Sequence, residues 1–417
     1  MKEIVIVSAC RTAIGAFGES LRTLNGATLA SIVMREAIKR AGISDDVIDD
    51  IRFGCCYDPI DSVNVARIGA LLAGIPETIP AVTVNRVCLS GMEAVISGAN
   101  MIKAGHADVV LAGGVEHMSG VPYLSLDARW GLRFQDKTLA DGLVHGLYNG
   151  SRLLPHPEEG PVKEGLPLDL YRGKPYLMGH TAEFIAQLHN ISREEMDEVA
   201  LRSHNMAERA TREGDFKDEI VPVEVPQRKG RPPLIFDKDE HFRPGLTMET
   251  LSKMPPAFVP EIGKVTAGNS SGINDGASAI LIMSADKAKE LGVTPLARIK
   301  ETGYGGCHPS VMGLSPVPAV KDLFKKNPLY SIDSFDLIEL HEAFAAQYIG
   351  CEKELKNKRE KTNINGSGIG LGHPVGSSAC RIMVTLLYAM KKHQKTLGLA
   401  TLCGGGGVSM ATIIEML

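Results

Sequence analysis

Short, continuous apolar runs alternate with segments of amphipathic helical spacing in the N-terminal part of the chain. Residues 4–7 form an apolar run typical of a strand buried on both faces, and residues 30–41 have the spacing of a helix. Residues 82–84 and 107–112 are further strand-like runs, separated by the helical pattern of residues 89–104. This order of strand, helix and strand predicts an α/β domain built on a parallel sheet.

The predicted helix at residues 89–104 carries small residues along its length. Gly91, Ala94 and Gly98 lower its intrinsic helix propensity, but they let another backbone approach closely. We therefore expect this helix to be buried.

The pattern changes over residues 120–245, which are charged, contain many prolines and have few strand-like runs. We predict that this segment is an inserted domain that is mostly helical and irregular. Inside it, Ser192 and Glu195 form the capping box of an amphipathic helix. The prolines of residues 151–175 exclude a helix there, while the leucines between them favour an ordered loop that covers another part of the protein.

An internal repeat links the two ends of the chain. Residues 84–119 contain Cys88, a long helix and an apolar strand, and they align with residues 364–410, which contain His373, a helix and an apolar strand. Two similar halves related by a pseudo-twofold axis are therefore expected, with Cys88 facing His373. The predicted boundaries are residues 1–119 and 246–293 for the first half, 120–245 for the insertion and 294–417 for the second half.

The net charge limits the classes of partner. The 417 residues include 45 Lys and Arg against 49 Asp and Glu, a net charge of −4, which does not favour nucleic acid or an acidic membrane surface. An anionic ligand would therefore need a local basic site. The candidates are four basic residues of the insertion, although such residues most often lie on a solvated surface. They are Arg243, Arg228, Lys229 and Arg231.

The eight cysteines are spread along the chain without CxxC spacing. This distribution argues against a zinc site and against a disulfide framework, and it is typical of a reducing cytoplasm. The sequence has no signal-peptide pattern and no apolar run of about 18 residues, so no membrane span is expected.

Cys88 is the strongest candidate for a nucleophile. It stands directly before the helical pattern, where free backbone N–H groups and the helix dipole favour an anion. We expect this position to lower the pKa of the thiol from its ordinary value of about 8.5. The alternative is a small buried hydrophobic residue, which is the commoner role of a cysteine.

His373 is the candidate general base. It lies between Gly372 and Pro374 in a glycine-rich loop before a helix, a rigid setting for proton transfer. The loop has no GxGxxG register and no acidic partner at the expected distance, so a dinucleotide site is rejected. A lone histidine is usually structural, but with Cys88 it completes a nucleophile and base pair.

Two further residues follow predicted strands. Cys403 ends an apolar strand and precedes four glycines, 404–407, whose N–H groups can point at a developing oxyanion. A thiol there is suited to moving a proton at a carbon next to a thioester, although a plain glycine-rich turn is the alternative. His341 follows the strand-like residues 337–340, at the sheet edge where active sites of α/β proteins usually lie.

These residues lie within separated motifs that occur together in one family, and over essentially its whole length the sequence resembles the thiolases. The matching motifs are VNRVCLSGMEA around Cys88, AGGVEHMS at 112–119, KVTAGNSSGINDGA at 264–277, HEAFAAQ at 341–347, GHPVGSSA at 372–379 and CGGGG at 403–407. The resemblance implies two βαβαβαββ halves in a five-layer αβαβα sandwich, with a loop domain inserted in the first half for coenzyme A binding and oligomerisation. It also implies a homodimer or homotetramer.

The resemblance also implies roles for individual residues. Cys88 would be acylated, His373 would activate it and help to bind a thioester oxygen, and Cys403 would exchange a proton at the α-carbon of the second acyl unit. The backbone N–H groups of Cys88 and Gly405 would form an oxyanion hole. The implied substrate contacts are Ser271 for the pantetheine arm, Arg243 near the nucleotide, and Met178, Met312 and Phe344 for the acyl group. Coenzyme A would be substrate and product, with no other cofactor and no metal.

The chain departs from the short-chain thiolase pattern in three places. His341 stands where many members have a catalytic asparagine, although an imidazole can still donate a hydrogen bond to water or a carbonyl. Residues 151–173 form a longer segment than the short-chain pattern has, and Leu177-Met178 replaces the usual His-Met. The length of the acyl chain is therefore the least determined property.

We expect an acyltransferase of lipid metabolism that interconverts two acetyl-CoA with acetoacetyl-CoA plus CoA through an acyl-Cys88 intermediate. The alternatives are a thiolase of fatty-acid β-oxidation that cleaves longer 3-ketoacyl-CoA, and a ketoacyl or hydroxymethylglutaryl synthase, which would give no reason for Cys403 in a CGGGG motif. A different class is a non-catalytic lipid carrier on the same fold, which has no need to keep Cys88, His373 and Cys403 together.

Overall fold

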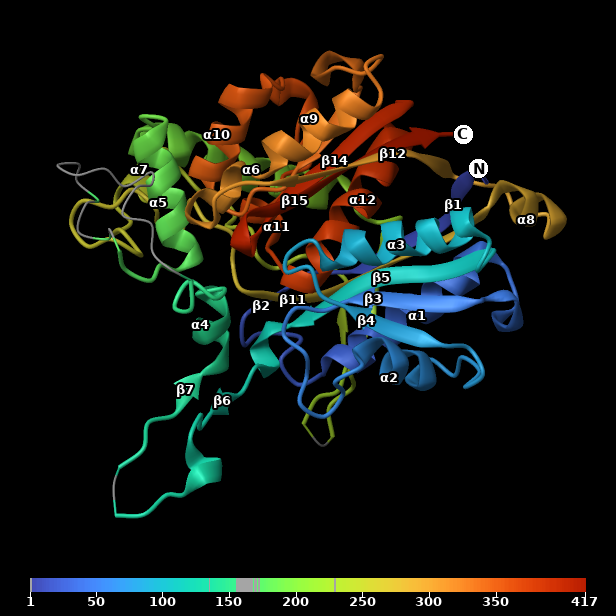
Figure 1. The fold of residues 1–417 in the computed structure, drawn as a ribbon, viewed down its shortest axis with the longest axis horizontal. Coiled ribbons are helices and arrows are strands. Elements are labelled where there is room, and N and C mark those ends of the chain that lie inside the picture. The colour runs from blue at the N-terminus through green and yellow to red at the C-terminus, as the bar shows by residue number, and fades with distance from the viewer. Residues whose placement is uncertain (1, 135, 155–167, 169–170, 172, 229) are drawn as a thin grey trace.

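The computed structural model describes residues 2–417 apart from residues 135, 155–167, 169–170, 172 and 229. Its elements stack in the order helix, sheet, helix, sheet, helix (Figure 1). The N-terminal sheet contains β1 (Ile4–Thr12), β3 (Asp50–Gly54), β4 (Ala81–Val84), β5 (Val109–His117) and β11 (Asn274–Ser284). The C-terminal sheet contains β12 (Ala297–Gly306), β13 (Leu337–Leu340), β14 (Leu397–Gly404) and β15 (Val408–Met416).

The strands follow the order β13-β14-β15-β12-β1-β11-β5-β3-β4, and the two sheets are joined where β1 pairs with β12. The prediction of a parallel sheet is correct for β3 with β4 and β5, and for β13 with β14. It is wrong for the centre of the first sheet, where β11 runs antiparallel to both β1 and β5. β11 follows the insertion and returns to the middle of the sheet, and its complete burial gives it an apolar sequence that carries no information about direction.

Three layers of helices cover the two sheets. The helices α1 (Gly26–Ala41) and α2 (Val65–Leu72) pack on one outer side, and α9 (Pro316–Lys326) and α10 (Ala345–Leu355) on the other. Between the sheets lie α3 (Ser90–Ala104) and α12 (Val375–Lys392), which share one hydrophobic core with both of them (Figure 1). The remaining helices are α4 (Gly142–Leu147), α5 (Met178–Leu188), α6 (Arg193–Glu213), α7 (Met248–Ser252), α8 (Ala285–Glu290) and α11 (Gly368–Leu371).

The small residues of α3 bring it into backbone contact with α12, as expected. A Cβ atom added to Gly91 would lie 2.8 Å from the backbone nitrogen of Cys380 and 3.0 Å from the oxygen of Gly376. On β5, a Cβ atom added to Gly114 would lie 2.2 Å from the same Gly376 oxygen. Because real Cβ contacts are not this short, only glycine allows the start of α12 to pack so closely on both elements.

The repeat is visible in the fold, with one difference between the halves. Each half has a sheet covered by helices, and α3 and α12 occupy equivalent central positions. Among the described residues of the second half, no strand takes the place of β4, and the chain there makes an isolated parallel bridge between Thr362 and Ile338. Asn363 continues this contact with side-chain hydrogen bonds to the backbone of Leu340.

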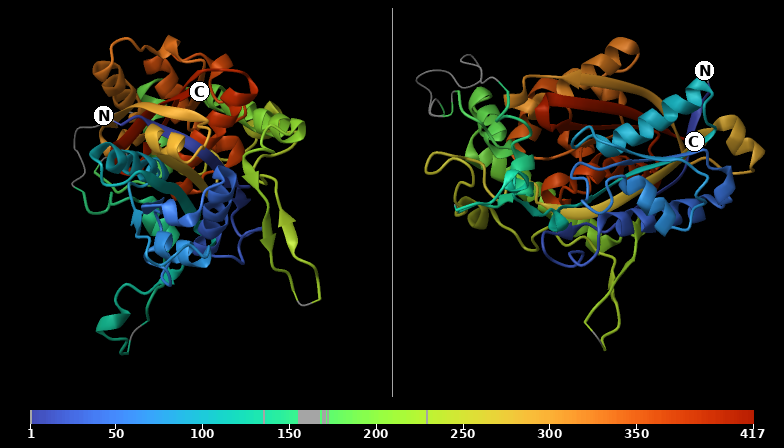
Figure 2. Two further views of the ribbon diagram at one scale, coloured as in Figure 1. Left: turned by 90° about the vertical axis from the view of Figure 1, so that its right-hand side faces the viewer. Right: turned by 60° about the horizontal axis from the view of Figure 1, so that its bottom comes forward.

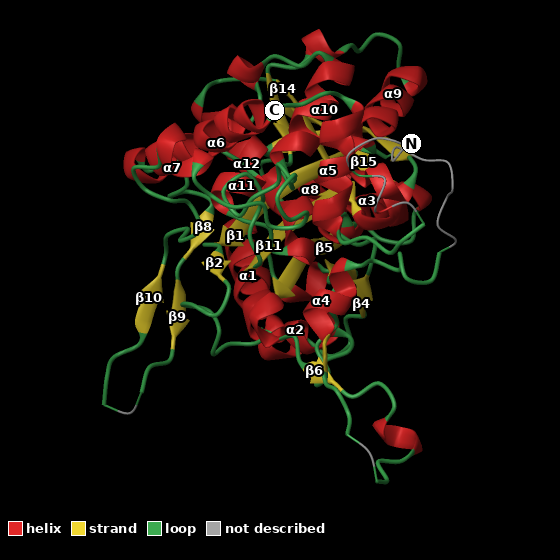
Figure 3. Cartoon of the chain, turned by 90° about the vertical axis from the view of Figure 1, so that its left-hand side faces the viewer, coloured by secondary structure: helices red, strands yellow, loops and turns green. Residues whose placement is uncertain are grey.

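The insertion is helical and irregular, and it also contains short strands. α6 begins at the predicted capping box: the Ser192 hydroxyl accepts a bond from the N–H of Glu195, whose carboxylate accepts one from the N–H of Ser192. Two short strand pairs project from the body of the molecule (Figures 2 and 3). The short strands of the chain are β2 (Gly15–Ala16), β6 (Tyr123–Leu124), β7 (Ala140–Asp141), β8 (Ile220–Val221), β9 (Val223–Val225) and β10 (Leu234–Phe236).

The prediction of an ordered loop at residues 151–175 falls largely outside the described residues. At its described ends, the Ser151 hydroxyl donates to the backbone oxygen of Tyr176, and Leu168 packs in a small core with Tyr176 and Phe184. Among the helices that the structure describes, none combines the length and apolar character that a bilayer crossing requires.

Candidate active site

A cavity of about 500 Å³ is lined by residues from both halves and from the insertion. It contains every residue to which the family resemblance gives a role, except His341. These residues are Cys88, Met178, Arg243, Ser271, Met312, Phe344, His373, Cys403 and Gly405. Segments far apart in the sequence therefore meet at one concave site.

The loop between β4 and α3 places Cys88 at the cavity wall. The hydroxyl of Ser90 accepts a bond from the N–H of Arg86 and donates to the carbonyl of Val87, which closes a tight turn. Val87 has a φ of 52°, in the left-handed region that a β-branched residue rarely adopts. Such strain typically costs about 1–3 kcal/mol and occurs most often at functional sites. The turn points the next residue, Cys88, into the cavity instead of along the helix axis.

The expected low pKa of Cys88 is not found, and that prediction was wrong. Removal from water raises the pKa of the thiol to about 11, opposed by the backbone N–H groups of Gly405 and of Cys88 itself. The nearby carboxylate of Glu116 raises the pKa further. Desolvation of the thiolate therefore outweighs the favourable N–H groups, and Cys88 would need a base to act as a nucleophile.

The same N–H groups form a pair of donors at the sulfur atom. Gly405 begins a short turn in which Gly406 and Gly407 have φ angles of 81° and 84°. The N–H groups of Gly405 and Cys88 both favour the thiolate form of Cys88, since each lowers the pKa of its thiol. Two donors that converge on this sulfur also lie beside any carbonyl bonded to it, which is the geometry of an oxyanion hole.

His373 is held by side chains on both sides. Its backbone N–H donates to Oδ1 of Asn274 at 2.9 Å, and its Nδ1 lies 2.7 Å from the hydroxyl of Ser378. That hydroxyl donates to the carbonyl of Pro374, so it accepts a hydrogen bond from Nδ1–H of His373. Nε2 of His373 is then left with a lone pair. Burial, followed by the charge of Arg381, lowers the pKa of His373 to about 3, so the ring is a neutral base at physiological pH.

His341 lies behind His373. It follows β13 as predicted, but it is completely buried and is not part of the cavity wall. The two imidazole rings have centroids 4.4 Å apart and an angle of 48° between their planes. Nδ1 of His341 lies 3.2 Å from Nη2 of Arg381. The structure thus places His341 next to the base, and its catalytic role stays a prediction.

Cys403 lies at the end of β14, one residue before the glycine turn, and lines the same cavity as Cys88. Burial raises its pKa well above the ordinary value, and a negative charge on Cys88 raises it further. The two thiols therefore disfavour simultaneous ionisation, which suits a site where they are deprotonated in turn. All eight cysteines are free thiols.

Comparison with known proteins identifies the family. Residues 4–152 and 162–286 match the model "Thiolase, N-terminal domain", and residues 293–416 match "Thiolase, C-terminal domain". The chain belongs to the thiolase family. It is 46% identical to an acetyl-CoA acetyltransferase from Syntrophomonas wolfei, over 100% of both chains. Thiolases are acyltransferases, and this chain is therefore an acyltransferase with the thiolase fold.

Solved structures support the same assignment. A crystal structure of the acetyl-CoA acetyltransferase from Bacillus anthracis has a TM-score of 0.91 and 42% identity, covering 100% of this thiolase and 99% of that chain. A crystal structure of human mitochondrial 3-ketoacyl-CoA thiolase in complex with CoA has a TM-score of 0.89 and 36% identity, covering 100% and 98%.

The predicted substrate contacts of this thiolase lie in two parts of the cavity. Met178, Met312 and Phe344 form an apolar part, where the ring of Phe344 meets that of Phe258 edge to face, with centroids 6.3 Å apart. Arg243 is exposed at the cavity and Ser271 is half-buried there. The other basic candidates, Arg228 and Arg231, lie between β9 and β10 and do not line the cavity, while Lys229 lies outside the described residues.

Sequence reasoning missed the residues that hold this site together. Glu116 is completely buried at the end of β5, and its carboxylate accepts bonds from the N–H groups of Cys56, Tyr57 and Gly376. Burial raises its pKa to about 7. The signal for Glu116 was a charged residue in an apolar strand. Asn274 had no comparable signal, because its partner, the N–H of His373, is 99 residues away in the sequence.

Proposed function

We propose that this thiolase interconverts two molecules of acetyl-CoA with acetoacetyl-CoA plus CoA through an acyl-Cys88 intermediate. The observation that carries the proposal is that Cys88, His373 and Cys403 line one cavity. The backbone N–H groups of Cys88 and Gly405, which lower the pKa of the Cys88 thiol, support it. The names of the relatives from Syntrophomonas wolfei and Bacillus anthracis support acetyl transfer.

In the first half-reaction, Cys88 becomes acylated. Nε2 of His373 takes the thiol proton, and the Cys88 thiolate attacks the thioester carbonyl of acetyl-CoA. The carbonyl oxygen becomes negative and accepts bonds from the N–H groups of Cys88 and Gly405. When the tetrahedral intermediate collapses, the bond to the coenzyme A sulfur breaks, and the leaving thiolate receives the proton from His373.

In the second half-reaction, a carbon nucleophile removes the acyl group. The Cys403 thiolate takes a proton from the α-carbon of a second acetyl-CoA, whose enolate oxygen is stabilised by the imidazole of His373. The α-carbon attacks the acyl-Cys88 carbonyl, and the carbon–sulfur bond breaks. The Cys403 thiol then gives its proton to the released Cys88 thiolate, and acetoacetyl-CoA leaves with both cysteines restored. Because coenzyme A departs before the second substrate reacts, ping-pong kinetics follow.

The substrate arm and the acyl group occupy different parts of the cavity. Arg243 is placed to contact a phosphate of coenzyme A, and Ser271 to contact the pantetheine chain. Met178, Met312 and Phe344 enclose the acyl group, and coenzyme A serves as substrate and product without another cofactor. A 3-ketoacyl-CoA with a longer chain is the second candidate, supported by the apolar lining and by the likeness to human mitochondrial 3-ketoacyl-CoA thiolase.

The insertion over residues 120–245 provides surface for assembly into a homodimer or homotetramer. Its projecting arm consists of β6, β7 and the residues between them. The arm exposes large apolar side chains, which a monomer in water would not require. They are Tyr123, Leu126, Trp130, Leu132, Phe134 and Leu139. The free thiols of the protein support a location in the cytoplasm.

The test uses the purified protein with acetoacetyl-CoA and coenzyme A, and compares its kcat/KM with that for 3-ketodecanoyl-CoA. Preference for acetoacetyl-CoA supports acetyl transfer, and a large preference for the longer thioester overturns it in favour of the second candidate. Mass spectrometry after incubation with acetyl-CoA is expected to show an acetyl group on the peptide that contains Cys88. A protein that binds both thioesters but turns over neither would be a carrier.

A further inference from the structure

The contact between His341 and Arg381 determines where the imidazole of His341 carries its proton. Nη2 of Arg381 lies 3.2 Å from Nδ1 of His341, and both side chains are completely buried. A guanidinium has five N–H donors and no acceptor, and it stays charged in proteins. Nδ1 must therefore be the acceptor, with its lone pair free. The single proton of a neutral His341 then lies on Nε2.

The other N–H donors of Arg381 show that the bond to His341 is its main directed contact. Among the described residues, Nε and Nη1 of Arg381 have no hydrogen-bond partner, and Nη1 lies 3.7 Å from the carboxylate of Glu339 in an ion pair. The directed bond of this desolvated cation therefore goes to His341. A buried guanidinium with unused donors is costly, and such an arrangement is typically kept for a functional reason.

We propose that Arg381 is a positioning residue that holds His341 in its neutral Nε2–H tautomer, so that His341 acts as a hydrogen-bond donor and never as a base. The inference rests on the proposed function and assigns a role to His341 in that reaction. It also explains how a histidine can replace an asparagine at this position, since both side chains then present one N–H donor.

The groups around the ring favour the neutral form. His373 faces His341 from the loop before α12, Arg381 from α12 itself, and Glu339 from β13, where the hydroxyl of Ser367 donates to its carboxylate. Glu342 is turned to Asn363 and Ser203 instead. Burial, His373 and Arg381 all lower the pKa of His341 well below its ordinary value.

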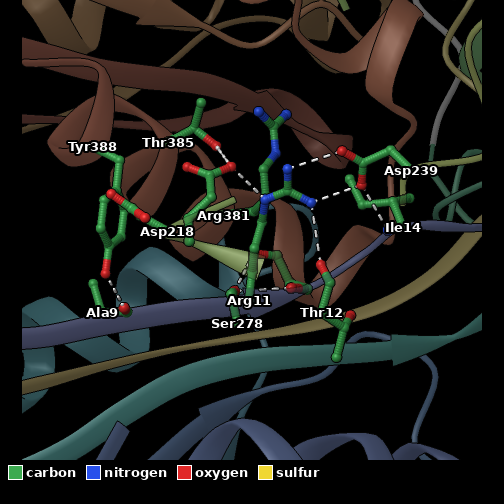
Figure 4. A network of polar contacts seen from close by, with 12 residues as sticks. Ala9, Arg11, Thr12, Ile14, Asp218, Asp239, Ser278, Arg381, Thr385 and Tyr388 are labelled. Atoms are coloured by element: carbon green, nitrogen blue, oxygen red, sulfur yellow. Dashed lines mark hydrogen bonds and ion pairs between the residues drawn. The ribbon is translucent and has the colours of Figure 1, made fainter. Parts of the chain in front are cut away.

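Arg381 itself belongs to a wider buried network of charges (Figure 4). The neighbouring Arg11 forms ion pairs with Glu219 at 2.6 Å and with Asp239 at 2.7 Å. Burial lowers the pKa of Arg381, as does the charge of Arg11, while Glu339, Glu219 and Asp239 oppose this and stabilise its positive charge. The network thus keeps a cation at Nδ1 of His341, which prevents a second proton from binding there.

In the part of the chain that the structure describes, the Nε2–H donor of His341 is unused, and it lies directly behind the cavity-lining His373. Nε2 is buried and has no hydrogen-bond partner among the described residues. It lies next to Gly368, where an added Cβ atom would be only 2.8 Å away, and the ring packs on His373. An oxygen acceptor that enters with the substrate, the thioester oxygen or a water bonded to it, would satisfy this N–H beside the base.

The direct test is the protonation state of His341 in the intact enzyme. Nitrogen-15 NMR of histidine-labelled protein distinguishes a protonated ring nitrogen from one with a lone pair, and the signals of His341 are assigned as those lost in His341→Asn. We expect a proton on Nε2 and a lone pair on Nδ1 throughout about pH 6 to 9. Arg381→Met should give a mixture of tautomers, while Arg381→Lys should keep the wild-type pattern. A proton on Nδ1 in the wild type overturns the proposal.

A matched pair of variants gives the kinetic test. Asparagine and aspartate have the same shape, but only asparagine can donate, so His341→Asn should keep kcat within about tenfold of the wild type. His341→Asp should lower kcat by about 10²–10³-fold, the usual effect of losing one such donor. KM should change less than about threefold, because the bond forms mainly in the transition state. Equal kcat values for the two variants contradict the proposal.

Two controls separate the possible failures. Arg35→Met removes a surface guanidinium that pairs with Asp45 and should leave kcat unchanged. If Arg381→Met does not fold, the wild-type spectrum and the His341 pair still decide the question. If the wild type shows no turnover of acetoacetyl-CoA, the proposed function fails, while the spectrum still confirms or overturns the tautomer.

Discussion

The loops that carry Cys88 and His373 occupy equivalent places before α3 and α12, but different forces hold them. The Cys88 loop is closed by its own neighbours, since Ser90 bonds the backbone of residues 86 and 87. The His373 loop has local bonds through Ser378, but its backbone is also held from a distance, by Asn274 and by Glu116, which binds the N–H of Gly376. The predicted nucleophile, Cys88, is thus positioned mainly by local sequence, whereas the predicted base, His373, also depends on the assembled fold.

The largest effect is expected at the nucleophile. Cys88→Ala removes the sulfur that forms the acyl intermediate, so kcat should fall by more than about 10⁴-fold, as for other catalytic nucleophiles. Mass spectrometry should then show no acetyl group on the protein. Cys403→Ser is the control, because it should still be acylated by acetyl-CoA while its condensation rate falls. An acetylated Cys88→Ala protein would place the nucleophile elsewhere.

The next prediction concerns the ionisation of Cys88 without substrate. The pKa of the Cys88 thiol is raised to about 11, so its thiolate forms only at a higher pH than that of an ordinary cysteine. The rate of alkylation by iodoacetamide should therefore rise about tenfold per pH unit from pH 7 to 10. The rate is followed by mass spectrometry of the Cys88 peptide. A plateau below about pH 9 would restore the original expectation of a low pKa.

Asn274→Ala tests how the base loop is held. It removes the acceptor of the His373 N–H, and small misplacement of a catalytic group can lower kcat by about 10²-fold. Ser90→Ala is the matched variant for the other loop. It removes a hydroxyl that makes two local hydrogen bonds, and we expect a smaller loss of kcat, of about tenfold. A larger loss in Ser90→Ala than in Asn274→Ala, measured in the acetoacetyl-CoA assay, would reverse the comparison.

The smallest effect is expected at Val87, whose φ of 52° strains the Cys88 loop. Asparagine adopts this conformation more readily, so Val87→Asn should raise the free energy of unfolding by about 1 kcal/mol. Val82→Asn, in the regular strand β4, is the control and should lower it by a similar amount. Urea denaturation measures both. If the two variants are destabilised equally, the loop stores no strain.

Features encoded by neighbouring residues could be predicted from the sequence. The capping box of Ser192 and Glu195, the helix start after Cys88 and the strand end before His341 all depend on residues within a few positions. The place of β11 could not be predicted, because a strand buried on both faces looks the same in either direction. The predicted pKa of Cys88 was wrong because the burial of its thiol depends on the whole cavity. The bond from Arg381 to His341 joins residues 40 positions apart, and no local pattern shows it.

The backbone contact between α3 and α12 divides the enzyme into two parts that can change independently. With Gly91 and Gly114 packed on the start of α12, the two central helices form one rigid block. The loops of Cys88 and His373 both lead into these helices. Met178, of the proposed acyl pocket, lies in α5, outside the two central helices. The substrate range of this thiolase can therefore be altered by exchanging loops, whereas its chemistry tolerates no side chain at two glycines.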